Sequence, residues 1–271
     1  MGKLPRMSAV PLTISGVGKD FTASGRRHAV LADVDLDVAA GEVVALLGPS
    51  GCGKSTLLRL AGGLDTPSAG TVLVDGSPVR GFEPRCAVVF QEPRLLPWRT
   101  IERNVAYGLP RGTTGERART EVAHWLSVVG LADFARHRPR QVSGGMAQRA
   151  ALARALARRP GVLLLDEPFA ALDALTRLRM QDLLAEVQRE AGTTVLLVTH
   201  DVDEALHLAD RVVLLGASAP GKPASVRLIQ PVPGDRPRDR GDAELAALRV
   251  TLLAELGVQT PVSPVKKESL I

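Results

Sequence analysis

The most informative part of this chain is Gly48-Pro49-Ser50-Gly51-Cys52-Gly53-Lys54-Ser55-Thr56. It fits the pattern G-x-x-x-x-G-K-[ST], and the apolar run 43–47 lies directly before it, where that pattern requires a strand. The glycines let the backbone curl, so that consecutive N–H groups and the start of the following helix point at one anion. The stretch therefore predicts a nucleoside triphosphate site, in which Lys54 reaches the terminal phosphates and Ser55 ligates Mg²⁺. The alternative is a glycine-rich strand-to-helix turn without a ligand.

The composition indicates a globular protein with a packed core. The chain has 271 residues, 45% of them hydrophobic, which is room for one large domain or two small ones. No run approaches the ~18 to 20 apolar residues that cross a bilayer, and no apolar signal segment begins the chain, so we expect it to be cytosolic. The net charge of +5 comes from basic residues dispersed among acidic ones, which indicates a mild surface bias.

Two cysteines are present, and they do not indicate a disulfide framework or a metal site. Cys52 lies inside the phosphate-binding stretch and Cys86 directly before a predicted strand, without metal-ligand spacing. We expect Cys86 to be a small core residue.

Apolar runs alternate with segments of helical spacing along most of the chain. Four further runs are typical of buried parallel strands, at 87–90, 162–165, 194–198 and 211–215. This alternation predicts an α/β fold with a covered sheet. Before residue 41, short alternating stretches at 12–14 and 30–36 predict a small antiparallel side sheet.

The middle and the end of the chain follow other patterns. No strand signal appears between residues 91 and 157, whereas 116–129 and 146–157 have helical spacing, which predicts a helical insertion. Residues 231–242 are rich in Pro, Arg and Asp, as is typical of a linker, and precede a helical stretch at 243–256 and a polar tail. No internal repeat is found.

Two acids follow the predicted strand 162–165. Asp166 is placed to hold the metal through its waters, and Glu167 to orient the attacking water or accept its proton. Alone, such a pair is often a solvated loop. Together with the phosphate-binding stretch, it predicts phosphoryl chemistry.

Polar residues also follow two other predicted strands. Gln91 comes after 87–90 and His200 after 194–198, at the strand ends where open α/β sheets bind ligands. Both are candidates for contact with the γ-phosphate, and the Gln91 amide for the metal as well. The alternative for His200 is a structural, hydrogen-bonded residue. Asp201 and Glu204 have the spacing of a capping box, so Asp201 is most simply a helix cap.

A second helix start in the predicted insertion has free N–H groups. Ser143, Gly144, Gly145 and Met146 open the helix 146–157 and offer another nest for phosphate. One chain already has a complete phosphate cradle, so this element suggests the nucleotide of a partner. The alternative is an ordinary N-cap followed by flexible glycines.

These residues have the order and spacing of the ABC-transporter ATPase family, which the chain resembles over residues 10–230. The resemblance implies a RecA-like P-loop ATPase core with an N-terminal antiparallel β subdomain, an inserted helical subdomain at about 92–157, and a linker and helical tail at 231–271. It also implies a role for each motif: Walker A at 48–56, the Q-loop at Gln91, the signature at 143–146, Walker B at 162–167, the D-loop at 171–173 with Asp173, the switch histidine at His200, and the adenine-stacking aromatic at Phe21. Phe21 as a core residue of the side sheet is the alternative.

Three features resemble the nitrate, sulfonate and taurine importers within that family. They are residues 90–98, Met146 in place of Gln, and 236–240. Val142 departs from the usual Leu before the signature, and we expect only a small change in packing. Trp98 either fills the core of the helical subdomain or, as the resemblance implies, lies beside the groove that takes a coupling helix of the membrane subunit.

By the same resemblance the chain binds and hydrolyses ATP with Mg²⁺ as a homodimer at the cytoplasmic face of the cell membrane. Its implied partners are integral-membrane permease subunits and, indirectly, an extracytoplasmic solute-binding protein, with no nucleic acid. A soluble ABC-type ATPase acting on nucleic acid or ribosomes is the alternative, but neither a heptad run nor a second phosphate loop appears. A small-molecule kinase would leave residues 143–146 and His200 without a role. The transported solute stays open.

Overall fold

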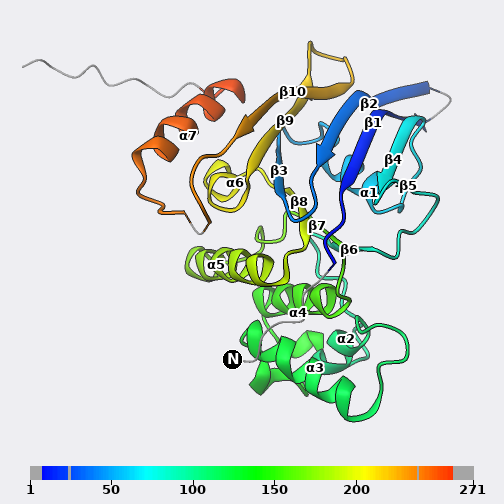
Figure 1. The fold of residues 1–271 in the computed structure, drawn as a ribbon, viewed down its shortest axis with the longest axis vertical. Helices are drawn as coiled ribbons and strands as arrows, with labels where there is room; N and C mark the ends of the chain where they lie inside the picture. Colours follow the sequence, from blue (N-terminus) through cyan, green and yellow to red (C-terminus); the bar gives the residue numbers. More distant parts are fainter. Residues whose placement is uncertain (1–7, 24–25, 237, 259–271) are drawn as a thin grey trace, which may run out of the picture.

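Five parallel strands form the centre of this computed structural model, which describes residues 8–23, 26–236 and 238–258 (Figure 1). In sheet order they are β9 (Arg211–Ala217), β3 (Val43–Leu47), β8 (Thr194–Val198), β7 (Val162–Asp166) and β6 (Cys86–Val89). Every residue of β3, β7 and β8 is buried. Because both faces of these strands are covered, each is an uninterrupted apolar run, and the predicted α/β core is confirmed.

The amino-terminal strands are antiparallel, as predicted, but they are longer than predicted and do not form a separate sheet. The described residues make one ten-stranded sheet, to which the remaining strands add β1 (Leu12–Ala23), β2 (Arg26–Val38), β4 (Ala69–Val74), β5 (Ser77–Pro78) and β10 (Ala224–Pro231). β10 pairs with β9 and, at Ala224 and Leu31, with β2. The register of β1 against β2 shifts at three places near Gly16, and each shift interrupts the two-residue alternation that marks a strand.

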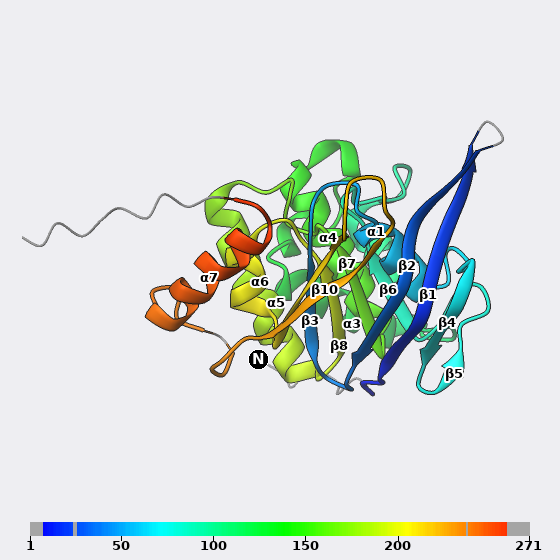
Figure 2. The same ribbon diagram turned by 90° about the horizontal axis from the view of Figure 1, so that it is seen from above.

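Helices cover both faces of the parallel strands. α1 (Lys54–Ala61) packs between them and the antiparallel strands, where Leu57 and Leu58 are fully buried. α4 (Gly144–Ala157), α5 (Ala174–Ala191) and α6 (Val202–Leu208) pack on the opposite face (Figures 1 and 2). Cys86 opens β6 instead of preceding the strand, and burial raises the pKa of its thiol to about 12, which confirms a small core residue.

The predicted helical insertion forms a lobe at one end of the molecule (Figure 1). It contains α2 (Ile101–Ala106), α3 (Gly115–Val128) and α4, with 3₁₀ turns at Ala132–Phe134 and Pro139–Gln141. α3 and α4 confirm the predicted helices within two residues at each end. The sequence analysis missed α2, because six residues are too few to show a helical period.

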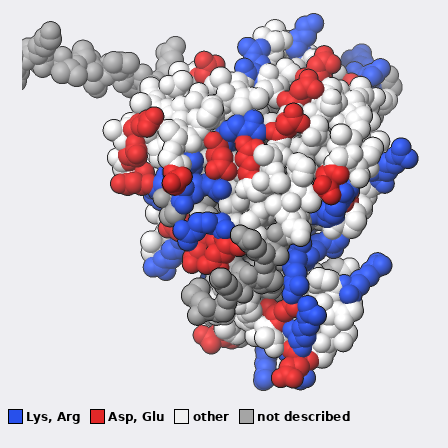
Figure 3. Space-filling view, in the orientation of Figure 1, with Lys and Arg blue, Asp and Glu red and all other residues white. Residues whose placement is uncertain are grey.

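The visible surface mixes charges of both signs. Figure 3 shows acidic and basic side chains interspersed over the face seen in Figure 1. Among the described residues, no helix combines the length and the apolar character that crossing a bilayer requires.

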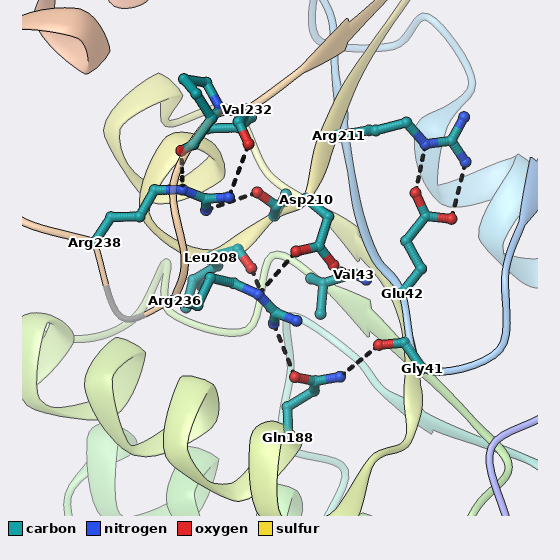
Figure 4. A network of polar contacts seen from close by, with 12 residues as sticks. Gly41, Glu42, Val43, Gln188, Leu208, Asp210, Arg211, Val232, Arg236 and Arg238 are labelled. Carbon is teal, nitrogen blue, oxygen red and sulfur yellow. Dashed lines mark hydrogen bonds and ion pairs between the residues drawn. The ribbon is translucent and has the colours of Figure 1, made fainter.

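The segment after β10, which the sequence marks as a linker, is fixed to the core by three arginines, of which Figure 4 shows Arg236 and Arg238. Arg236 pairs with Asp210 at 3.0 Å and donates to Gln188, while Arg240 donates to Gln181 and Asp182. Arg238, only 7% exposed, donates to four backbone carbonyls, those of Leu206, Ala209, Val232 and Pro233. The described residues of this segment therefore form a strap over the end of α6.

α7 (Ala243–Glu255) follows the strap and confirms the predicted helical stretch at 243–256. It packs on α6, and Arg249 pairs with Asp203 at 2.8 Å. Residues 259–271 of the predicted polar tail lie outside the described residues.

The start of α6 differs from a capping box. Asp201 caps it, as predicted, by accepting from the N–H groups of Asp203 and Glu204. The Asp201 N–H, however, donates to Thr199 Oγ1, and the Glu204 side chain turns into the protein, where it is 5% exposed. Burial, reinforced by the Asp201 carboxylate, raises the pKa of Glu204 to about 8.

We expect Arg238→Met to lower the free energy of unfolding by about 2 to 4 kcal/mol, because the backbone carbonyls that Arg238 binds, most of them buried, lose their donor. Urea unfolding measures the change. Arg227→Met on the exposed face of β10 is the control, with an expected change under about 0.5 kcal/mol. Equal effects of the two substitutions would show that the strap is not anchored by Arg238.

We expect Glu204→Gln to change how stability depends on pH. A carboxyl whose pKa rises from 4.5 to about 8 on folding favours the folded state most below pH 4.5, and this contribution is lost as the pH rises toward 8. The free energy of unfolding of the variant, relative to the parent, should therefore increase across that window. Urea unfolding at several pH values tests this, with exposed Glu190→Gln as the control. A difference that does not vary with pH would contradict the raised pKa.

Candidate functional site

The predicted phosphate loop joins β3 to α1 in a backbone shape that needs glycine. Gly53 at the start of α1 has φ +104°, and Gly48 has φ +156°. A Cβ on Gly48 would lie 2.2 Å from the carbonyl oxygen of Leu215, so no other residue fits there. No side chain caps α1, and its first turn contains no acid, which leaves its N–H groups directed at the loop.

Lys54 lies at this loop with its ammonium group held by backbone carbonyls. Its Nζ donates to Gly48 O at 2.8 Å and to Pro49 O at 3.0 Å, and the residue is only 6% exposed. Among the described ion pairs Lys54 has no carboxylate partner, so its charge is available to an anion in the loop.

Ser55 and Asp166 meet directly, although 111 positions separate them. Ser55 Oγ donates to Asp166 Oδ1 at 2.7 Å. Burial raises the pKa of Asp166, and the neighbouring Glu167 raises it further, against the lowering effect of the Ser55 hydrogen bond.

Glu167 and His200 form a second pair at the carboxyl ends of the central strands, where Asp166 also lies. His200 Nδ1 lies 3.2 Å from Glu167 Oε2, with the imidazole mostly exposed and the carboxylate largely covered. The Glu167 backbone has φ +46°, and its N–H donates to Val198 O at 2.9 Å. A left-handed backbone at a non-glycine residue costs roughly 1 to 3 kcal/mol, and residues of this kind are enriched at functional sites.

The register of β6 against β7 places Gln91 near the same carboxyl ends of the strands. Val89 pairs with Leu165 in the adjacent strand, one residue before Asp166, and the chain leaves β6 at that level. The Gln91 side chain is exposed.

The signature residues lie on a different lobe from the phosphate loop. Ser143 caps α4 by accepting from the Met146 N–H at 3.2 Å, so the N-cap alternative describes its contact within the chain. A Cβ on Gly145 would lie 3.0 Å from Leu172 Cδ2, so the signature touches the predicted D-loop. Asp173 in that loop caps α5 by accepting from the Thr176 N–H.

The two aromatic residues with alternative roles are both exposed. Phe21 is 42% exposed and has the Lys19 ammonium 5.0 Å from its ring centroid, so the core alternative is wrong. Trp98 is 68% exposed, so it does not fill the helical core, which contains Trp125 instead. Stacking of Phe21 on adenine stays a prediction.

Two polar contacts at the site were not predicted. Gln148, 3% exposed on α4, donates from Nε2 to Phe90 O at 2.9 Å, next to Gln91. Arg177 on α5 pairs with Asp201 at 3.7 Å and donates to Leu172 O, which connects the predicted D-loop with the residue after His200. A sequence feature could have revealed Gln148, because its polar amide lies on a face of α4 that otherwise consists of alanine and leucine.

Comparisons with known proteins agree with this geometry. A family model described as ABC transporter matches residues 31–170. The aliphatic sulfonates import ATP-binding protein SsuB 1 of Xanthomonas axonopodis pv. citri is 49% identical over 92% of this chain and 98% of its own length. The protein of the same name from Streptomyces avermitilis is 49% identical over 93% of this chain and 89% of its own length.

Solved structures give the same result for the fold. A dimeric ATP-binding cassette in a post-hydrolysis state with ADP and Pi matches with a TM-score of 0.74 at 32% identity, covering 83% of this chain and 100% of that one. Fold, site geometry and sequence similarity thus agree, and this chain belongs to the ABC transporter family as one of its ATP-hydrolysing cassettes.

Proposed function

We propose that this cassette powers the import of an aliphatic sulfonate or a related small anion such as taurine or nitrate. The support is the shared name of the two relatives together with similarity over nearly their whole length. In this proposal the chain is a peripheral subunit at the cytoplasmic face of the membrane. It binds integral-membrane permease subunits, which an extracytoplasmic solute-binding protein supplies with solute.

The alternatives from other classes have less support. The relatives are named as import proteins, which favours an importer over a soluble ATPase acting on nucleic acid or ribosomes. If the chain were a small-molecule kinase, the N–H groups at the helix start after Ser143 would have no phosphate to bind.

The observation that carries the hydrolytic role is the Glu167–His200 pair beside the phosphate loop. Glu167, which follows Asp166 at the end of β7, accepts the proton of the attacking water. His200 orients that carboxylate and contacts the γ-phosphate. Lys54 exchanges its two carbonyl partners for phosphate oxygens, while the N–H groups at the start of α1 bind the phosphate chain.

The residues at the end of β7 fit a magnesium ion. Mg²⁺ prefers oxygen ligands, and Ser55 Oγ and Asp166 Oδ1 lie 2.7 Å apart. Burial makes the Asp166 carboxylate costly to ionise, and a nearby cation would offset that cost. Ser55 and the Gln91 amide would hold the ion, with Asp166 acting through waters. When bound, Mg²⁺ neutralises charge that develops on phosphate oxygens.

The position of the signature supports a homodimer as the active form. Its helix start lies in the helical lobe, whereas the phosphate loop lies in the core (Figure 1), and each loop is a complete cradle for one nucleotide. Two copies placed head to tail bring each signature and its Asp173 to the nucleotide of the other copy, so two ATP molecules become part of the interface. The γ-phosphate favours this closed pair, and hydrolysis removes the preference. The helical lobe passes the resulting movement to the permease.

We expect Glu167→Gln to lower kcat for ATP hydrolysis at least about a hundredfold while leaving nucleotide affinity within about twofold, because the base is lost and the loop is intact. With ATP the variant should elute as a stable dimer in size-exclusion chromatography. Glu186→Gln, an exposed carboxylate on α5, is the control and should hydrolyse ATP like the parent. Parent-like turnover by Glu167→Gln would remove Glu167 from the catalytic role.

We expect deletion of this gene in its own organism to lower the uptake of a labelled alkanesulfonate at least about tenfold, since no solute moves without hydrolysis. The parent gene should restore uptake, and the Glu167→Gln gene should not. Uptake of sulfate is the control. If the deletion leaves sulfonate, taurine and nitrate uptake unchanged, the proposed solute class is wrong, whatever the ATPase activity of the purified chain.

A further inference from the structure

The loop that contains Gln91 is attached to the helical lobe through its backbone carbonyls. Residues 90–99 form no helix or strand. At the far end of the loop, Asn104 of α2, fully buried, donates to the carbonyls of Leu96 and Arg99 and accepts from the Leu96 N–H at 2.7 Å. The described hydrogen bonds between this loop and helices or strands involve side chains of α2 and α4.

The near end of the loop, around Gln91 itself, is held by α4. Arg154 donates from Nη2 to Pro93 O and from Nη1 to Arg94 O, both at 2.9 Å. On the other side of Gln91, Gln148 donates to Phe90 O at 2.9 Å. Two side chains of the signature helix therefore bracket Gln91 along the backbone, one before it and one after it.

Arg154 is suited to this contact by its shape. A planar guanidinium fixes two neighbouring carbonyls at once, which an ammonium group on a flexible stem does not. Arg154 is partly buried, and among the described ion pairs it has no carboxylate partner, so the carbonyls of the loop are what stabilise its charge. Burial lowers the pKa of its guanidinium, because the charged form loses solvent.

We propose that Arg154 is a positioning residue for Gln91, tying the Gln91 loop to the signature helix so that both reach their phosphate contacts as one unit. This inference rests on the role proposed above for Gln91. Arg154 touches neither nucleotide nor water in this scheme, because it acts through the carbonyls of Pro93 and Arg94. Its loss leaves the phosphate loop unchanged but lets Gln91 take up positions unrelated to that of the signature.

The chain provides a matched control one and a half turns earlier on the same helix. Arg149 donates to Val129 O at 2.9 Å and to Gly130 O at 3.3 Å, and burial lowers its pKa as it does for Arg154. Both arginines thus fasten α4 to backbone carbonyls, Arg149 to those at the end of α3 and Arg154 to those of the Gln91 loop. Arg149, however, has no contact with the Gln91 loop among its described hydrogen bonds.

The test compares Arg154→Met, Arg154→Lys and Arg149→Met in the purified full-length chain by steady-state ATP hydrolysis, binding of a fluorescent ATP analogue and thermal unfolding. We expect Arg154→Met to lower kcat about tenfold with nucleotide affinity within about twofold, and Arg154→Lys to recover part of the loss. Arg149→Met should keep kcat within about twofold, even if it unfolds at a lower temperature. Equal losses of kcat in the two Met variants would overturn the proposal. If Arg154→Met does not fold, the Lys variant makes the same comparison.

A double-mutant cycle with Gln91→Ala separates positioning from general stability. If Arg154 acts through Gln91, adding Arg154→Met to Gln91→Ala lowers kcat no further, whereas a structural effect multiplies the two losses. Multiplied losses would overturn the positioning role and leave the proposed role of Gln91 standing. Parent-like kcat in Gln91→Ala alone would instead show that Gln91 has no part in hydrolysis, and the proposal for Arg154 would fall with it.

Discussion

The hydrogen bond between Ser55 Oγ and Asp166 Oδ1, 2.7 Å long, joins the first turn of α1 to the end of β7, and the rest of the site is arranged around it. It can form only because β3, β8 and β7 are adjacent and parallel. Val198 pairs with Leu46 on one side and with Asp166 on the other, so all three strands end at one level. The polar residue after each strand therefore enters the same space. A different strand order would keep every motif and lose the site.

The signature is positioned by other means. It lies at the start of α4, outside the sheet. α4 packs on β6, Gly145 lies against Leu172, and the side chains of Gln148 and Arg154 bind the Gln91 loop. Hydrogen bonds from side chains to loop carbonyls allow a lobe to turn as a body, because the loop moves with the helix that holds it. In the proposed function, the helical lobe moves together with this loop while the strand ends stay fixed.

The parallel core was predictable because burial on both faces gives unmixed apolar runs such as 162–165, which turns and glycines delimit. The bulged strand β1 was underestimated because its register shifts interrupt the alternation that reveals a strand. The Walker A residues were found because their chemistry lies in consecutive positions. Contacts such as Arg154 with Pro93 were not found, since the two residues lie 61 positions apart and no local pattern encodes their meeting.

The strap over α6 shows that composition alone does not predict which arginines are buried. Its Pro, Arg and Asp residues are typical of a solvated linker, and by charge alone Arg238 belongs on the surface. In the fold, Arg238 is buried among four carbonyls, and Arg149 and Arg154 also direct their guanidinium groups at backbone oxygens. Guanidinium groups used in this way are not available to partners at the surface, because backbone oxygens occupy their donors. The formal charge of +5 therefore does not by itself describe the surface, since arginines such as Arg238 join a segment without a strand or helix of its own to the core.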